Sequence, residues 1–173
     1  NNATGITGMV NDTIYFAKIM DSSGNFNGVL NAVNDMAYFP QIKVINVSWK
    51  VAHSAALETA FNNLYYNYGK LIIAAAGTDG ACNPLGSGNP LDTVYPARYP
   101  SVVSVGNINS DRTLNCSSSY GPFQELVAPG GQDLSGNLII STLPNNSYNY
   151  MSGTSMAAPH VAGLAGLLFS VNP

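Results

Sequence analysis

The feature that most constrains the fold is an unbroken apolar run at residues 71–76, which ends at Gly77. A strand with one face in water alternates apolar and polar residues, whereas a strand buried on both faces is apolar throughout. Sheets built from such strands are parallel and carry helices on both faces. The run therefore predicts an internal strand of a covered parallel sheet.

The segments around this strand alternate between helix and strand patterns. Apolar residues recur at helical spacing over residues 29–37, and Pro40 ends that helix. Ser54 is a candidate N-cap of a second helix, which Gly69 terminates. Further strands are expected at residues 12–20, 43–47, 102–105 and 138–142. The alternation predicts an α/β fold, a parallel sheet with helices on both faces, in a single domain over residues 1–173.

The composition argues against two classes of partner. Charged residues make up 9% of the chain and the formal net charge is −3, whereas nucleic-acid binding needs a basic surface. The longest apolar segment, residues 161–171, is shorter than the roughly 18 residues of a membrane span. We therefore expect neither nucleic acid nor membrane as a partner. The first residue is not Met, so we expect the chain to begin inside a longer protein.

Two cysteines, Cys82 and Cys116, leave two interpretations open. They form a disulfide if the compartment is oxidising, or they remain as buried thiols. Spacing alone does not decide between these alternatives. Together with the two histidines, His53 and His160, the cysteines do not make a zinc-binding pattern.

The chemistry is concentrated in residues 153–163, which read Gly-Thr-Ser-Met-Ala-Ala-Pro-His-Val-Ala-Gly. An apolar helix runs from this motif toward the C-terminus, and Ser155 lies at its start. The first N–H groups of a helix have no partner within it, and together with the helix dipole they stabilise negative charge. Taken alone, Ser155 also fits a plain N-cap, because serine is common at that position.

The motif resembles the nucleophile signature of the subtilisin family of serine proteases (the subtilases) nearly letter for letter. The similar segments follow in the family's order and cover essentially the whole chain: residues 1–10, 44–48, 71–77, 95–106 and 127–130. The resemblance implies a three-layer subtilisin-like fold and a secreted serine endopeptidase that acts on protein or peptide substrates. Ser155 is then the nucleophile that forms an acyl-enzyme.

The same resemblance implies that part of the catalytic machinery precedes Asn1. The family carries its catalytic Asp on an early strand and its catalytic His on a helix, so the N-terminal strands and the catalytic-His helix are expected to be missing. We therefore expect the chain to be inactive alone. His160 points away from Ser155 along the helix, and His53 fits a surface or capping residue.

Loss of that Asp-bearing strand would leave a gap in the sheet. The strands expected at residues 15–20 and 44–48 would flank the gap, and their unpaired edges would be costly. We expect the missing N-terminal half, or a second copy of the chain in a swapped dimer, to fill it.

The resemblance also assigns an oxyanion donor and the walls of the substrate groove. Thr78 stands where the family has an Asn that donates to the oxyanion, and a Thr hydroxyl has one donor and a shorter reach. The implied substrate-binding residues are Ser48, Trp49, Lys50, Ala75, Ala76 and Gly77. Lys50 and Val51 replace glycines of the family. Two interpretations of Lys50 stay open: it favours acidic substrate side chains, or it points to solvent.

The start of the chain resembles half of the family's calcium site. Asn2 would contribute its side-chain oxygen, and Thr4 and Ile6 would contribute carbonyls. Calcium takes about 6–8 oxygen ligands, so we expect it only in the full-length protein.

Other functions compete with the protease. The departures at Thr78 and Lys50 and the missing partners fit a pseudoprotease or peptide-binding module. An α/β-hydrolase esterase fits poorly, since residues 153–157 lack the second glycine of Gly-x-Ser-x-Gly. No Gly-x-Gly-x-x-Gly follows a strand, which argues against dinucleotide binding.

Overall fold

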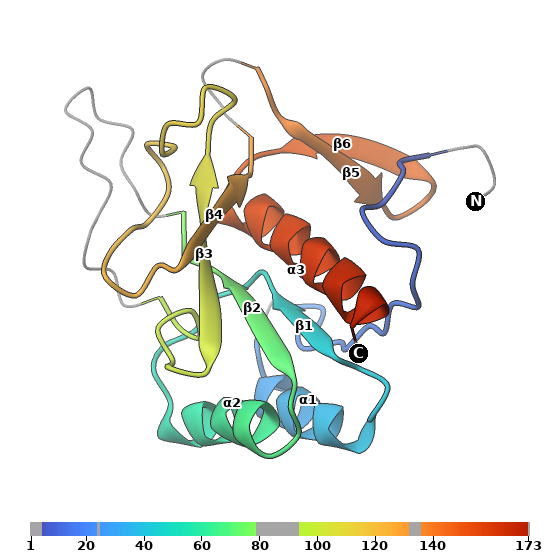
Figure 1. Cartoon of the computed structure of the whole chain (residues 1–173), viewed down its shortest axis with the longest axis vertical. Helices are drawn as coiled ribbons and strands as arrows, with labels where there is room; N and C mark the ends of the chain where they lie inside the picture. Colours follow the sequence, from blue (N-terminus) through green and yellow to red (C-terminus); the bar gives the residue numbers. More distant parts are fainter. Residues whose placement is uncertain (1–4, 24, 79–93, 132–135, 173) are drawn as a thin grey trace.

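The computed structural model describes residues 5–23, 25–78, 94–131 and 136–172 (Figure 1). A four-stranded parallel sheet has the order β1-β2-β3-β4. Its strands are β1 (Val44–Val47), β2 (Leu71–Ala75), β3 (Val102–Ile108) and β4 (Leu126–Pro129). The helices are α1 (Val29–Asp35), the 3₁₀ turn η1 (Met36–Tyr38), α2 (Ala55–Tyr66) and α3 (Thr154–Val171).

Strand β2 shows why helices cover both faces of this sheet. Its residues Ile72 and Ala74 belong to one core cluster, which includes Phe61 of α2. Its alternate residues Ile73 and Ala75 belong to a second cluster, which includes the buried alanines of α3. Successive side chains of a strand point to opposite faces, so α2 and α3 lie on opposite sides of the sheet. The predicted α/β fold, with a parallel sheet between two helical layers, is confirmed.

The helix ends follow the sequence signals. The Ser54 hydroxyl accepts a hydrogen bond from the N–H of Leu57, at 3.3 Å, and so caps α2. Gly69 adopts a φ of 62°, a left-handed conformation that glycine tolerates, in the turn between α2 and β2. The helix expected at residues 29–37 forms as α1 continued by η1. The strands expected at 43–47, 71–76 and 102–105 form as β1, β2 and β3.

The strand expected at residues 12–20 is wrong. That segment is irregular, and most of its apolar side chains are exposed, with Ile14 70% and Phe16 90% exposed, while Ile19 packs against the core. The N-terminal segment instead runs beside α3, where Met9 and Val10 lie against Gly163 and Gly166. A strand needs a neighbour for its N–H and C=O groups, and the described residues supply none there.

Strand β1 is consequently an edge strand within the described part of the chain. It pairs with β2, and the N–H of Leu71 donates to the carbonyl of Lys43 at 2.9 Å. In a parallel ladder, alternate residues direct their backbone groups to alternate sides. Val44 and Asn46 therefore direct theirs away from β2, toward the open edge.

A second correction concerns residues 138–142. They form β5 (Ile139–Leu143), which pairs antiparallel with β6 (Ser147–Met151) in a separate two-stranded sheet, not in the parallel one. Asn145 and Asn146 make the turn, with φ values of 63° and 54°. Asparagine tolerates such angles better than most residues, so this pair was a hairpin signal. Strands β4 and β6 were not predicted.

Helix α3 is longer than the apolar segment at residues 161–171. By length and composition it could cross a membrane, which corrects the expectation that no segment is long enough. A core helix passes the same test, and α3 packs along all four strands of the sheet. Its outer face is nevertheless uncovered, with Leu168 63% and Val171 84% exposed.

The structure establishes the state of one of the two cysteines. Cys116 is disulfide-bonded, and the chain's other cysteine, Cys82, lies outside the described residues. The interpretation with two free thiols is therefore wrong.

Candidate active site

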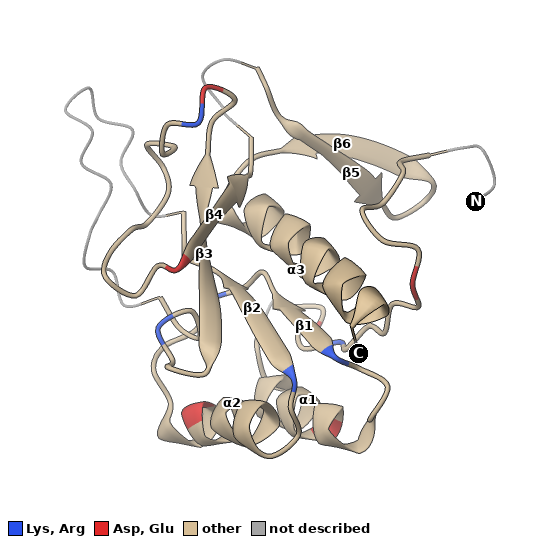
Figure 2. Cartoon of the chain, in the orientation of Figure 1, with Lys and Arg blue, Asp and Glu red and all other residues tan. Residues whose placement is uncertain are grey.

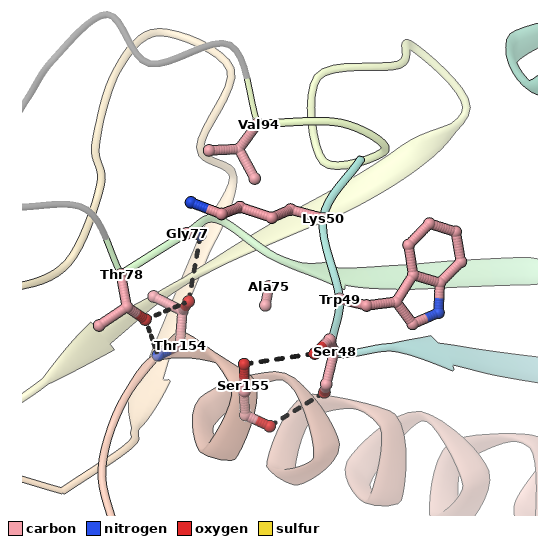
Figure 3. Close-up of a pocket in the computed structure, with 9 residues that line it drawn as sticks. All are labelled: Ser48, Trp49, Lys50, Ala75, Gly77, Thr78, Val94, Thr154 and Ser155. Atoms are coloured by element: carbon pink, nitrogen blue, oxygen red, sulfur yellow. Dashed lines mark hydrogen bonds between the residues drawn. The ribbon is translucent and has the colours of Figure 1, made fainter. Parts of the chain in front are cut away.

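A cavity of about 270 Å³ opens where the carboxyl ends of β1 and β2 meet the amino end of α3 (Figure 3). Open parallel sheets place their sites at this edge. The cavity is lined by Ser48, Trp49, Lys50, Ala75, Gly77, Thr78, Val94, Thr154 and Ser155.

The structure thus brings together most of the residues expected at the site. The exception is Ala76, which is fully buried and does not line the cavity. Val94 and Thr154 line it but were not predicted. The signal for Thr154 was its place beside Ser155 in the nucleophile motif, whereas no sequence pattern marks Val94.

Ser155 is the second residue of α3 and is tied to the end of β1. Its hydroxyl donates to the carbonyl of Ser48 at 3.4 Å, and the Ser48 hydroxyl donates to the carbonyl of Ser155 at 2.9 Å. Within the described residues, the N–H of Ser155 has no protein acceptor. This N–H, at the positive end of α3, is therefore available to a developing negative charge.

Two threonines connect the end of β2 to the start of α3. The N–H of Gly77 donates to Thr154 Oγ1 at 3.1 Å, and the N–H of Thr154 donates to Thr78 Oγ1 at 3.2 Å. The two hydroxyl oxygens lie 3.1 Å apart (Figure 3). A hydroxyl donates one hydrogen bond and accepts two. When Thr154 donates to Thr78, both acceptor positions of Thr78 are filled and its own proton is free to bind another group.

Gly153 makes this arrangement possible. Its φ of 134° is one that other residues rarely adopt. A Cβ at this position would lie 3.0 Å from Thr78 Oγ1. Its N–H donates to the carbonyl of Gly130 at 2.8 Å, which fixes the entry to α3. A side chain at residue 153 would therefore displace the Thr78 hydroxyl.

The two histidines of the chain are engaged away from the serine. His53 Nε2 lies 3.1 Å from a carboxylate oxygen of Glu58, and its ring packs edge-on against Tyr95. His160 Nδ1 lies 2.8 Å from the carbonyl of Met156, one turn earlier in α3. Neither histidine is bonded to Ser155, in agreement with the sequence expectation. Among the residues described, Ser155 has no imidazole base.

The comparisons with known proteins decide the family. The model of the subtilase family of peptidases matches residues 1–173. The chain belongs to the subtilase family. The resemblance found in its nucleophile motif is thereby confirmed over the full sequence.

Curated relatives align with almost the whole chain but are longer. A thermophilic serine proteinase of Bacillus sp. (strain AK1) is 39% identical over 98% of this chain and 39% of its own length. Subtilisin DY of Bacillus licheniformis is 36% identical over 100% of this chain and 60% of its own length. This subtilase chain therefore spans between about two fifths and three fifths of the relatives it matches.

Solved protease structures agree with the fold. A cold-adapted subtilisin-like serine proteinase superposes with a TM-score of 0.74 and 32% identity, covering 90% of this chain and 52% of that one. The Prenylagaramide maturation protease PagA gives a TM-score of 0.69 at 28% identity, over 87% of this chain and 52% of its own. The subtilisin-like architecture is thus shown by structure as well as by sequence.

Two of the three expected calcium ligands lie outside the part of this subtilase that the structure describes. Asn2 and Thr4 lie outside the described residues, and Ile6 lies in an irregular, exposed segment. One carbonyl is far short of the roughly 6–8 oxygens that calcium takes. The calcium site therefore stays a prediction for the full-length protein, and no chemical step below involves it.

Proposed function

We propose that this chain carries the nucleophile of a serine endopeptidase and that Ser155 attacks the carbonyl carbon of a peptide bond. The observation that carries the proposal is the position of Ser155: first turn of α3, inside the cavity, between the ends of β1 and β2. The attack forms a tetrahedral intermediate, which expels the amine and leaves an acyl-enzyme that water hydrolyses.

The oxyanion of that intermediate would be held by two donors. One is the N–H of Ser155, which has no acceptor among the described residues. The other is the Thr78 hydroxyl, whose proton is free when Thr154 donates to it. Donors that are already in place when the charge develops contribute most to such catalysis.

The proton of the Ser155 hydroxyl must be taken by a base. His53 and His160 are bonded elsewhere, to Glu58 and Met156. We infer that the base and the acid that orients it come from residues of the full-length protein outside this chain. The isolated chain then has little or no peptidase activity.

A fluorophosphonate probe tests the proposal, because it labels activated serines. The full-length protein should be labelled, mass spectrometry should place the label on Ser155, and Ser155→Ala should abolish it. The chain alone should react far more slowly. Absence of labelling in the folded full-length protein would overturn the proposal.

A peptide-binding module without catalysis is the second candidate. It is favoured by the engagement of both histidines and by Thr78 in place of the family's Asn. It predicts that the full-length protein binds peptides yet resists the fluorophosphonate. The two candidates therefore differ in one measurement.

We also propose that the open edge of β1 is paired in solution, by the remainder of the full-length protein or by a second copy of the chain. Unpaired backbone groups at an edge are a template for an added strand.

We further propose that the protein is secreted. The disulfide at Cys116 supports this, because such bonds persist in oxidising compartments.

A further inference from the structure

Two buried asparagines, Asn107 and Asn115, bind the same backbone carbonyl near the start of α3. Asn107 Nδ2 donates to the carbonyl oxygen of Gly131 at 2.9 Å, and Asn115 Nδ2 donates to the same oxygen at 3.2 Å. Asn107 is 0% exposed and Asn115 is 3% exposed. The asparagines are also joined to each other, because the N–H of Asn115 donates to the carbonyl of Asn107 at 2.8 Å. Together they fix Gly131 from inside the fold.

Asn107 reaches this carbonyl from the face of the sheet that carries α3. It lies two residues after Val105 in β3, and Val105 belongs to the core cluster that includes the buried alanines of α3. Residues two apart in a strand share a face. The groups that hold Gly131 are uncharged amides, and Figure 2 shows that charged residues are sparse and scattered over the described part of the chain. Hydrogen-bond direction therefore defines the contact.

The turn that the asparagines fix is packed against the segment that enters α3. The carbonyl of Gly130 accepts a hydrogen bond from the N–H of Gly153 at 2.8 Å. A Cβ on Gly131 would lie 3.1 Å from the carbonyl oxygen of Met151, and a Cβ on Gly130 would overlap Asn107. The turn therefore fits closely between Asn107 and residues 151–153, so a shift on one side reaches the other.

Ser155 follows this contact directly, since it lies two residues after Gly153. On the other side, the N–H of Gly77 at the end of β2 donates to Thr154 Oγ1 at 3.1 Å. The start of α3 is thus held between the ends of β2 and β4. The β4 side depends on the turn that the asparagines fix.

We propose that Asn107 and Asn115 are positioning residues for the nucleophile. By fixing Gly131 they fix the start of α3, and with it the hydroxyl and the N–H of Ser155. The inference rests on the proposed function and deepens it, because neither asparagine lines the cavity. A displacement of about 1 Å at a reacting group, caused by a distant substitution, lowers a rate by up to about 10²-fold.

Asn107→Ala in the full-length protein tests the proposal by removing one donor to Gly131. Labelling of Ser155 by the fluorophosphonate should slow by about tenfold or more. For a peptide substrate, kcat should fall by the same factor and KM should stay within about twofold, because the cavity lining is unchanged. Asn115→Ala should act in the same direction. Asn62→Ala, in α2 on the opposite face of the sheet, is the control and should leave the labelling rate unchanged.

A second pair of variants leaves both asparagines in place and disturbs the turn itself. Gly131 and Gly136 have φ values of 85° and 74°, so alanine is strained at both. A Cβ on Gly131 would press on Met151, whereas one on Gly136 would have no atom within 4 Å. Gly131→Ala should therefore slow the labelling of Ser155, and Gly136→Ala should not. This pair decides the link to α3 even if Asn107→Ala fails to fold.

Amide hydrogen exchange, followed by NMR, reports on the start of α3 without any catalysis. The N–H of Gly153, which is bonded to Gly130, should exchange faster in Asn107→Ala than in wild type. The N–H of Ala76, which is bonded to the carbonyl of Val105 in the sheet, should be unaffected. Unchanged exchange at Gly153 would overturn the proposal.

The labelling results separate this inference from the proposed function. If wild-type Ser155 is not labelled but exchange at Gly153 responds to Asn107→Ala, the endopeptidase is wrong and the hold on α3 stands. If wild type is labelled and Asn107→Ala and Gly131→Ala are labelled as fast as their controls, the endopeptidase stands and the asparagines do not position Ser155. A rise in KM with unchanged kcat would also overturn the positioning role.

Discussion

Ser48 and Ser155 are far apart in the sequence but are joined by two hydrogen bonds. The Ser48 hydroxyl donates to the Ser155 carbonyl at 2.9 Å, and the Ser155 hydroxyl donates to the Ser48 carbonyl at 3.4 Å. The two residues are 107 positions apart, so the contact joins the end of β1 to the start of α3. It sets the distance between one wall of the cavity and the proposed nucleophile.

Ser48→Ala should therefore weaken the link between β1 and α3 and destabilise the fold. Loss of the hydrogen bond to Ser155 is expected to lower the free energy of unfolding by about 1 kcal/mol. Urea denaturation followed by circular dichroism measures this. Ser22→Ala, in an exposed turn, is the control and should leave the midpoint unchanged. Equal midpoints for both variants would show that the contact does not stabilise the fold.

Gly153→Ala should be more damaging than an ordinary glycine substitution. The new Cβ would meet Thr78 Oγ1 at 3.0 Å in a backbone conformation that costs about 1–3 kcal/mol. Gly69→Ala is the matched control, because Gly69 also has a positive φ but a Cβ there would have no atom within 4 Å. Thermal unfolding should show a larger loss for residue 153. Similar losses would mean that the contact with Thr78 adds nothing.

Thr78→Val tests the oxyanion donor, since it keeps the shape of the side chain and removes the hydroxyl. In the full-length protein it should slow peptide hydrolysis by up to the roughly 10²–10³ that loss of one side-chain donor costs in subtilisin itself. Thr78→Ser keeps the hydroxyl and should retain most of the rate. A Thr78→Val enzyme as fast as wild type would remove Thr78 from the oxyanion site.

The loop before α1 should weaken in acid because of Asp21. The backbone N–H of Asn25 donates to this carboxylate at 2.9 Å, and with the Asn25 side chain it lowers the pKa of Asp21 below 3.8. A carboxyl whose folded pKa is lowered stabilises the fold fully above its unfolded value, and this stabilisation disappears as the pH falls through the folded value. Asp21→Asn should therefore unfold more easily than wild type at pH 7. The difference should shrink as the pH falls below the usual carboxyl pKa of about 3.9, and it should vanish once Asp21 is protonated in the folded protein. A constant difference across this range would contradict the assignment.

The open edge of β1 should make the chain self-associate when it is produced alone. Light scattering coupled to size exclusion should give a dimer. Asn46→Pro should return it to a monomer, because proline removes an N–H that faces the open edge and is not bonded to β2. Asn46→Ala is the control and should remain dimeric. A monomeric wild type would refute the swapped or paired dimer.

The sequence predicted the parts of the fold that local chemistry decides. The apolar run at residues 71–76 forms β2, Ser54 caps α2, and the cavity gathers most residues implied by the family resemblance. The sequence misassigned segments whose secondary structure depends on a neighbouring strand. Residues 12–20 have strand composition but no neighbouring strand among the described residues. The direction of Lys50 was also undecided, because only the packing of Trp49 and Val51 fixes it.

The exposed face of α3 makes the state of the molecule visible to a dye. Leu164, Leu168 and Val171 are all at least half exposed, on a helix whose buried residues are mainly alanines. Fluorophores such as anilinonaphthalene sulfonate brighten on apolar surface of this kind. The chain alone should therefore give a strong signal while retaining its secondary structure. Any polypeptide that covers this face should reduce the signal, which provides an optical assay for its association with the chain.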